Sequence, residues 1–138
     1  MFCYITSLPK YLVAMAKTIQ EITDIIANFS KERGWTNEDP GQLISSLFIE
    51  MGELAEHYQW QSRFKPFNEE EKQIIGYEFT DVIFYLFRLA SNSGIDIEKY
   101  FLEKIPKLAK KFPVGTTDED WEKAHKTYRK SGKSKLYE

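Results

Sequence analysis

The sequence is poor in the features that mark disulfide scaffolds, membrane spans and nucleic-acid binders. Cys3 is the only cysteine in 138 residues, so no internal disulfide framework can form, and the chain is compatible with a reducing cytosol. No apolar run approaches the roughly 20 residues of a membrane-spanning helix. The formal net charge is −2, whereas a duplex DNA binder usually has a clear basic excess. We therefore expect a cytoplasmic protein without a membrane or nucleic-acid partner.

Signals for strands and hairpins are also weak, whereas signals for helices are strong. No Asn-Gly or Asp-Gly turn separates alternating segments. Apolar residues recur at helical spacing between start and stop signals, such as the capping-box pair Thr18 and Glu21 and the glycine Gly34. Pro106 lies inside the fourth such pattern and predicts a kink or an early end there. We expect an all-α fold, four-helix-bundle-like with appendages, with helices over residues 18–33, 40–61, 68–91, from 96 onward, and 118–130.

The length argues for one domain with an appendage at each end. We expect an N-terminal arm over residues 1–17, a helical domain over residues 18–115, and a short helix with a basic tail over residues 116–138. The first 15 residues lack a clear cleavage signature, so we do not interpret them as a signal peptide. A docking arm and an extension upstream of a natural start at Met15 both remain open.

Two acidic pairs place both of their members on one helix face. Glu50 and Glu53 are three residues apart in the second expected helix, and Glu78 and Asp81 are three apart in the third. At about 100° per residue, Glu78 falls inside the apolar arc of its helix and Asp81 at the edge of that arc. Glu50 abuts the apolar arc of the second helix, and Glu53 follows it. These four carboxylates therefore border the packed side of the bundle.

A carboxylate at such a place is costly unless it is paired or bound to a metal. A divalent cation turns the mutual repulsion of the acids into attraction, and all-oxygen ligands suit Mg²⁺ or Mn²⁺ better than zinc. The residues alone therefore indicate a carboxylate-lined divalent-metal site, without identifying a substrate. Solvated helix faces are the competing interpretation. A di-iron site ranks low because it needs a Glu-x-x-His spacing, which neither helix has.

The same residues resemble the two motifs of a known family. Residues 50–60, EMGELAEHYQW, resemble the first motif of MazG-like all-α nucleoside triphosphate pyrophosphohydrolases, and residues 78–86, EFTDVIFYL, resemble the second. The resemblance extends roughly from Ile19 to Gly115 and is closest to the dCTP pyrophosphatase branch. It implies hydrolysis of a nucleoside triphosphate, canonical or modified, to a monophosphate and pyrophosphate, in the service of cleaning the nucleotide pool.

The resemblance also implies roles for single residues and an assembly. Mg²⁺, or Mn²⁺ in its place, would neutralise the triphosphate and orient water for attack on the α-phosphorus. A homodimer or homotetramer is implied as well, and the wide apolar arcs of the second and third helices fit it. The catalytic metal ligands would be Glu50, Glu53, Glu78 and Asp81, and the substrate-binding residues would be Trp35, Trp60, Tyr85 and Lys104.

The departures from the family pattern fall on base recognition. Ile26 replaces a histidine of the dCTP-specific branch, Leu108 replaces an asparagine, and the His-x-Pro loop reads Glu38-Asp39-Pro40 here. The four acidic positions are intact. We therefore expect pyrophosphohydrolase chemistry without assuming dCTP as the substrate.

Three other functions remain as alternatives. The first is a pyrophosphohydrolase for another nucleotide-like substrate, such as a phosphoribosyl nucleotide. The second is a non-catalytic helical interaction protein that keeps the fold, although all four acids are retained. The third is nucleic-acid binding through the basic tail, where a solvated terminus is the ordinary interpretation of the charge run. Salt-dependent binding would be the mark of that third function.

Overall fold

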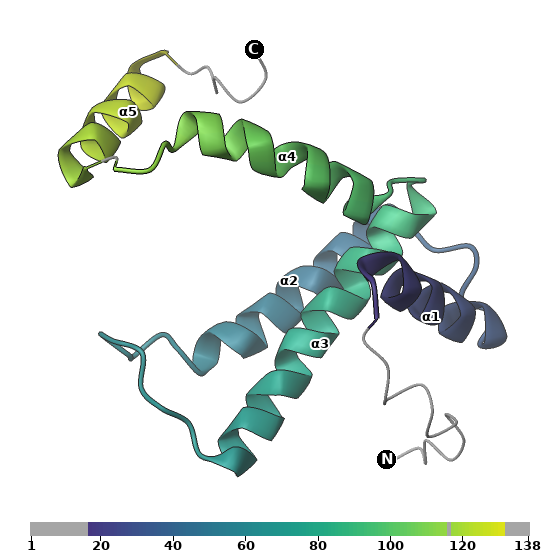
Figure 1. Ribbon diagram of the computed structural model, residues 1–138. Coiled ribbons are helices and arrows are strands. Elements are labelled where there is room, and N and C mark those ends of the chain that lie inside the picture. Colours follow the sequence, from purple (N-terminus) through teal and green to yellow (C-terminus); the bar gives the residue numbers. More distant parts are fainter. Residues whose placement is uncertain (1–16, 116, 132–138) are drawn as a thin grey trace. The chain divides into compact units, whose positions relative to one another are not determined.

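The computed structural model describes residues 17–115 and 117–131, with part of the last helix described by its backbone alone. Over these residues the fold is entirely helical, and no strand is present (Figure 1). The all-α prediction is thus confirmed. The predicted arm, except for Lys17, and the end of the basic tail lie outside the described residues. The helices are α1 (Ile19–Glu32), α2 (Pro40–Glu56), α3 (Glu69–Asn92), α4 (Ile97–Lys111) and α5 (Asp118–Ser131).

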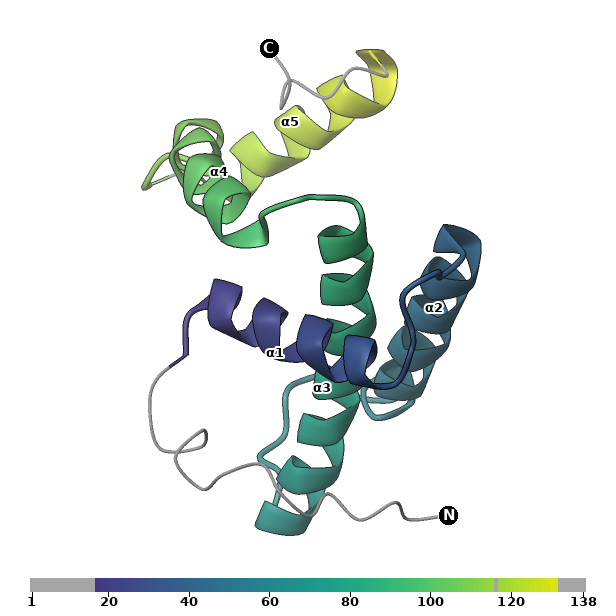
Figure 2. The same cartoon turned by 90° about the vertical axis from the view of Figure 1, so that its right-hand side faces the viewer.

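The chain divides into two compact units, Met1–Ile97 and Glu98–Glu138. In the first, α2 and α3 lie side by side and antiparallel, and α1 crosses α3; Figure 2 shows this crossing from the side. Among the described apolar side chains, the buried ones are few and come from all three helices: Ile26, Leu43, Leu47 and Ile75. The predicted three-part division of the chain remains a prediction.

Side-chain caps fix where the helices of the first unit begin. Before α1, the Glu21 amide donates to Thr18 Oγ1 over 3.1 Å, and the Thr18 amide donates to Glu21 Oε2 over 2.7 Å. The same reciprocal pair, formed by Asn68 and Glu71, precedes α3. Each box satisfies backbone N–H groups that lack a partner at a helix start. The predicted starts of both helices are therefore confirmed.

The second helix ends earlier than the sequence predicts, at Glu56 rather than at residue 61. The backbone tightens after it, with the His57 amide donating to Leu54 O and the Tyr58 amide to Ala55 O. The Tyr58 ring packs edge-on against Phe67 and Phe79 at centroid distances of 5.8 and 6.5 Å. This aromatic packing, between residues distant in the sequence, accompanies the turn, and helical periodicity cannot reveal it.

The sequence predicts either a kink or an early end of the fourth helix at Pro106. The early end is wrong, because α4 continues to Lys111. In the second unit, the Phe112 and Trp121 rings stack at a centroid distance of 4.2 Å. Thr117 caps α5, because its Oγ1 accepts from the Asp120 amide over 3.3 Å. The predicted helix over residues 118–130 is confirmed to within one residue. Among the described helices, none combines the length and the apolar composition of a membrane span.

Candidate functional site

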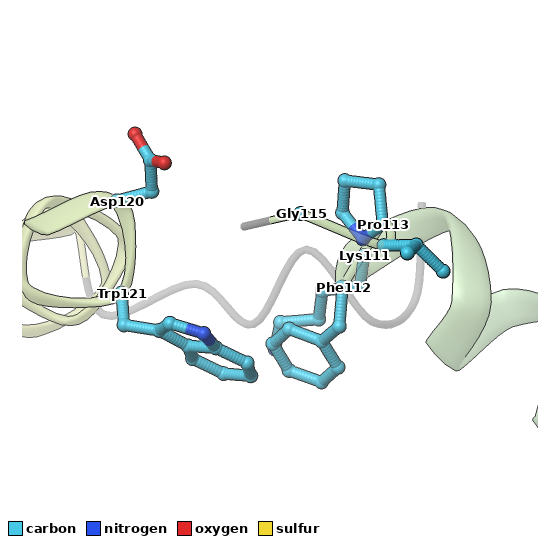
Figure 3. A pocket seen from close by; sticks show the side chains of 7 residues that line it. Lys111, Phe112, Pro113, Gly115, Asp120 and Trp121 are labelled. Atoms are coloured by element: carbon cyan, nitrogen blue, oxygen red, sulfur yellow. The ribbon is translucent and has the colours of Figure 1, made fainter. Parts of the chain in front are cut away.

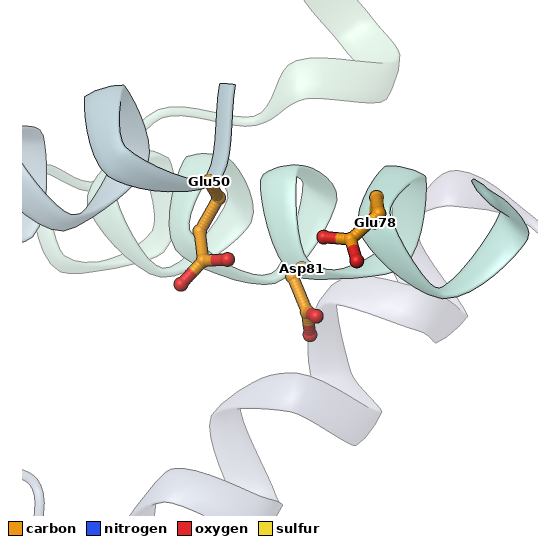
Figure 4. A group of neighbouring side chains, drawn as sticks. All are labelled: Glu50, Glu78 and Asp81. Carbon is orange, nitrogen blue, oxygen red and sulfur yellow. The ribbon is translucent and has the colours of Figure 1, made fainter. Parts of the chain in front are cut away.

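Three of the four predicted acidic ligands converge across the antiparallel pair α2–α3. Carboxylate oxygens of Glu50, Glu78 and Asp81 lie within 4.8 Å of one another. Figure 4 shows Glu50 on α2 and the other two, one turn apart, on α3. Glu50 and Glu78 are partly buried and Asp81 is exposed. The arrangement follows from the i,i+3 spacing on α3, combined with the pairing of α3 against α2.

Burial and neighbouring negative charges raise the cost of ionising Glu50. Burial raises the pKa of Glu50, and the negative charges of Asp81, Glu53 and Glu78 raise it further. Like charges in a partly buried cluster destabilise the ionised form, and a cation held among them removes that penalty. The donor set is all oxygen, which suits a hard cation such as Mg²⁺ or Mn²⁺. The residues present therefore fit the metal that the sequence predicts.

Glu53 is not part of the converging cluster. It is exposed and lies one helical turn after Glu50, on the same face of α2. Its charge nevertheless acts on Glu50, as the raised pKa of that residue shows. The role of Glu53 as a fourth ligand therefore remains a prediction.

A hollow of about 250 Å³ is lined by residues of α2, of α3 and of the loop before α2, and two of these residues lie one helical turn from the acidic cluster. It contains Trp35 and Tyr85, two of the aromatic residues that the sequence assigns to a base pocket. Tyr85 follows Asp81 by one turn of α3, and Ser46 precedes Glu50 by one turn of α2. The remaining lining residues are Glu38, Gln42, Leu43 and Arg88.

A buried cation that was not predicted from the sequence lines this hollow. Arg88 is only 6% exposed and forms an ion pair with Glu38, whose side chain is 16% exposed. Burial lowers the pKa of the Arg88 guanidinium. The guanidinium carbon lies 5.0 Å from the Trp35 ring centroid and 5.5 Å from that of Tyr85, within cation–π range. The sequence does carry one indication that Arg88 belongs to the site. Arg88 follows Asp81 by seven residues, which is about two helical turns, so the two residues share a helix face.

Comparison with known proteins places these residues in a family. The sequence model of the MazG-like family matches residues 45–126, more than half of the chain. This chain belongs to the MazG-like family. The dCTP pyrophosphatase 1 of Rattus norvegicus and that of Homo sapiens are each 31% identical to it over 102 residues. The aligned part is 70% of this chain and 60% of each relative, so the chain spans about three fifths of the length of the curated relatives it matches.

The MazG-like match covers the three converging acids, Glu53 and Arg88, and begins after Trp35. The match also contains the other two predicted substrate-binding residues, Trp60 and Lys104. Trp60 follows α2 in a turn and is 87% exposed, and it does not line the hollow. Lys104 lies on α4, in the second unit. The substrate contacts of both residues remain predictions.

A second hollow, of about 380 Å³, lies in the second unit around the stacked pair Phe112 and Trp121 (Figure 3). Its acidic residue Asp120 accepts hydrogen bonds from the Thr117 amide and hydroxyl. None of the predicted site residues lines this hollow. The hollow beside the carboxylates is therefore the candidate substrate site.

Proposed function

We propose that this MazG-like chain is a metal-dependent nucleoside triphosphate pyrophosphohydrolase. The observation that carries the proposal is the convergence of Glu50, Glu78 and Asp81 next to a hollow that contains two aromatic rings. Similarity to proteins named dCTP pyrophosphatase 1 supports the same reaction class.

In this proposal the acidic cluster holds Mg²⁺, or Mn²⁺ in its place, and Glu53 joins as a fourth ligand. When bound, the cation supplies charge neutralisation for the triphosphate and activation of the attacking water. The carboxylates would hold the cation, and Trp35 and Tyr85 offer aromatic faces to the base. At about 1.5 Å per residue, Tyr85 lies about 6 Å and Arg88 about 10.5 Å along α3 from Asp81.

The substrate in this proposal is a canonical or modified (d)NTP, and the role is cleaning of the nucleotide pool in the cytoplasm. The relatives are named for dCTP, but Ile26, Leu108 and Glu38 replace the family residues that the sequence analysis associates with base recognition. A different pyrophosphate-containing nucleotide is the second candidate substrate.

The reaction is tested by measuring pyrophosphate release from a panel of (d)NTPs, with Mg²⁺ and with chelator. We expect release of pyrophosphate and the matching monophosphate with Mg²⁺ alone, because the clustered carboxylates need the cation to accept a triphosphate. The appearance of pyrophosphate and a nucleoside monophosphate distinguishes this reaction from stepwise removal of single phosphates. Turnover in chelator at the rate seen with Mg²⁺, or no pyrophosphate from any nucleotide, would contradict the proposal.

We also propose that the chain forms a homodimer or homotetramer. Large apolar side chains remain exposed on α2 and α3, with Phe48 at 66% and Tyr77 at 60%. Exposed apolar surface of this extent is typical of an interface. The other large exposed apolar residues on the two helices are Ile44, Ile49, Met51, Ile74, Phe79, Ile83 and Leu86.

The assembly is tested by light scattering on the wild type and on Phe48→Asp. We expect the wild type to have the mass of a dimer or tetramer, and Phe48→Asp to lower it, because burying an unpaired charge in an apolar interface is costly. Val114→Asp is the matched control, since Val114 is exposed in the second unit, and it should leave the mass unchanged. A folded wild type that remains monomeric at micromolar concentration would contradict the assembly.

A further inference from the structure

The hollow beside the acidic cluster has a fixed cation in its lining, and an arginine offers hydrogen-bond donors only. Arg88 comes from α3, and Glu38 comes from the loop between α1 and α2. Glu38 Oε2 also accepts from Asn92 Nδ2 over 3.1 Å. The Glu38 carboxylate therefore accepts from both Arg88 and Asn92, and it holds the guanidinium near the Trp35 and Tyr85 rings.

One donor of this guanidinium is left over. Within the part of the chain that the structure describes, the buried Arg88 Nε–H has no acceptor. A buried donor without a partner carries a desolvation penalty, and an acceptor that enters as the surrounding side chains open relieves it. Because the guanidinium has no lone pair, the atom that relieves it must be an acceptor.

We propose that Arg88 is the residue that selects the base, by donating to an exocyclic oxo group of a base that packs against Trp35 and Tyr85 in this hollow. An oxo group accepts the hydrogen bond, whereas an amino group at the same position presents a second donor to a buried cation. The hollow should therefore favour uracil over cytosine and hypoxanthine over adenine. Within each pair, an oxo group replaces an amino group. The adjacent ring nitrogen carries a proton in the oxo member and none in the amino member. This inference rests on the proposed function, because it takes the ligand of the hollow to be a nucleotide.

The test measures binding of nucleoside monophosphates by calorimetry, in chelator, so that neither metal nor hydrolysis enters. The probes are dUMP against dCMP and dIMP against dAMP. We expect the wild type to prefer the oxo member of each pair by about 10- to 100-fold, the scale of one hydrogen bond to a charged donor. A purely structural role for Arg88 would change the affinity of both members alike, so the ratio is the decisive readout.

The variant that removes the selector is the double substitution Glu38→Gln with Arg88→Met, which leaves no unpaired charge behind. It should bring each ratio to about 1 while the helical circular dichroism signal remains. Arg33→Met is the matched control: this exposed arginine sits over the Phe29 ring, outside the hollow, and its loss should leave the ratios unchanged.

The outcomes separate this inference from the proposed function. A double variant that keeps the wild-type ratios, a wild type with ratios near 1, or a wild type that binds no monophosphate would overturn the selection by Arg88. Pyrophosphate release with an unchanged base ranking in the double variant would overturn it too, while leaving the enzyme activity intact. The protein could also bind monophosphates selectively, lose that selectivity in the double variant, and yet release no pyrophosphate. This result would support the base site and contradict the proposed reaction.

Discussion

Replacing Asp81 by Asn is expected to lower pyrophosphate release by at least about 100-fold, the scale on which the loss of one charge-stabilising group lowers catalysis. Asp81 carries one of the three negative charges that converge on the candidate metal position. Asn keeps the shape of the side chain but supplies a neutral ligand. The measurement is the initial rate of pyrophosphate release at saturating Mg²⁺.

The same substitution is not expected to unfold the protein. Asp81 is exposed, and its charge is one cause of the raised pKa of Glu50, so its removal relieves repulsion in the metal-free state. We therefore expect the metal-free Asp81→Asn variant to melt at or above the wild-type temperature. This combination of lost turnover and kept stability distinguishes a ligand from a structural residue.

A matched control for Asp81→Asn is Glu70→Gln. Glu70 is an exposed acid in the first turn of the same helix, outside the converging cluster, and its loss should leave turnover unchanged. Asp81→Asn with the wild-type rate, in a folded protein, would remove the assignment of this cluster as the metal centre. Glu53→Gln in the same assay then decides whether the exposed acid one turn along α2 joins the cluster when metal binds.

Features set by short stretches of sequence were predictable. The caps at Thr18 and Asn68 depend on residues three positions away, and the shared face of Glu78 and Asp81 follows from the helical repeat. The convergence of Glu50 with that pair needed one further step, the packing of two successive helices. The apolar arcs at Glu50 and Glu78 indicated that these two helices pack against each other.

Features set by contacts between distant residues were not predictable in this way. The end of α2 at Glu56 coincides with the packing of Tyr58 on Phe67 and Phe79. The pair Arg88 and Glu38 joins a helix to a loop 50 positions earlier, and one sequence alone carries no signal of that pairing. The pair and its place in the hollow depend on how the loop packs against α3.

The ion pair of Arg88 and Glu38 should also carry a large stability effect. Replacing Arg88 by Met alone leaves the Glu38 carboxylate, 16% exposed, without its cation. Breaking a buried pair from one side typically costs about 3–5 kcal/mol, because the remaining charge stays desolvated. We expect a loss of that order in the free energy of unfolding, measured by urea denaturation.

The double variant Glu38→Gln with Arg88→Met should recover most of that loss, since no uncompensated charge remains and the introduced amide oxygen can still accept from Asn92. Arg33→Met provides the comparison: its pair with Glu32 is exposed and 3.7 Å long, so its loss should change stability by less than about 1 kcal/mol. A double variant as unstable as Arg88→Met would mean that packing of the guanidinium against the rings, rather than the charge pair, holds the loop. Recovery of stability together with loss of base selection would instead show that the pair serves the ligand and is dispensable for the fold.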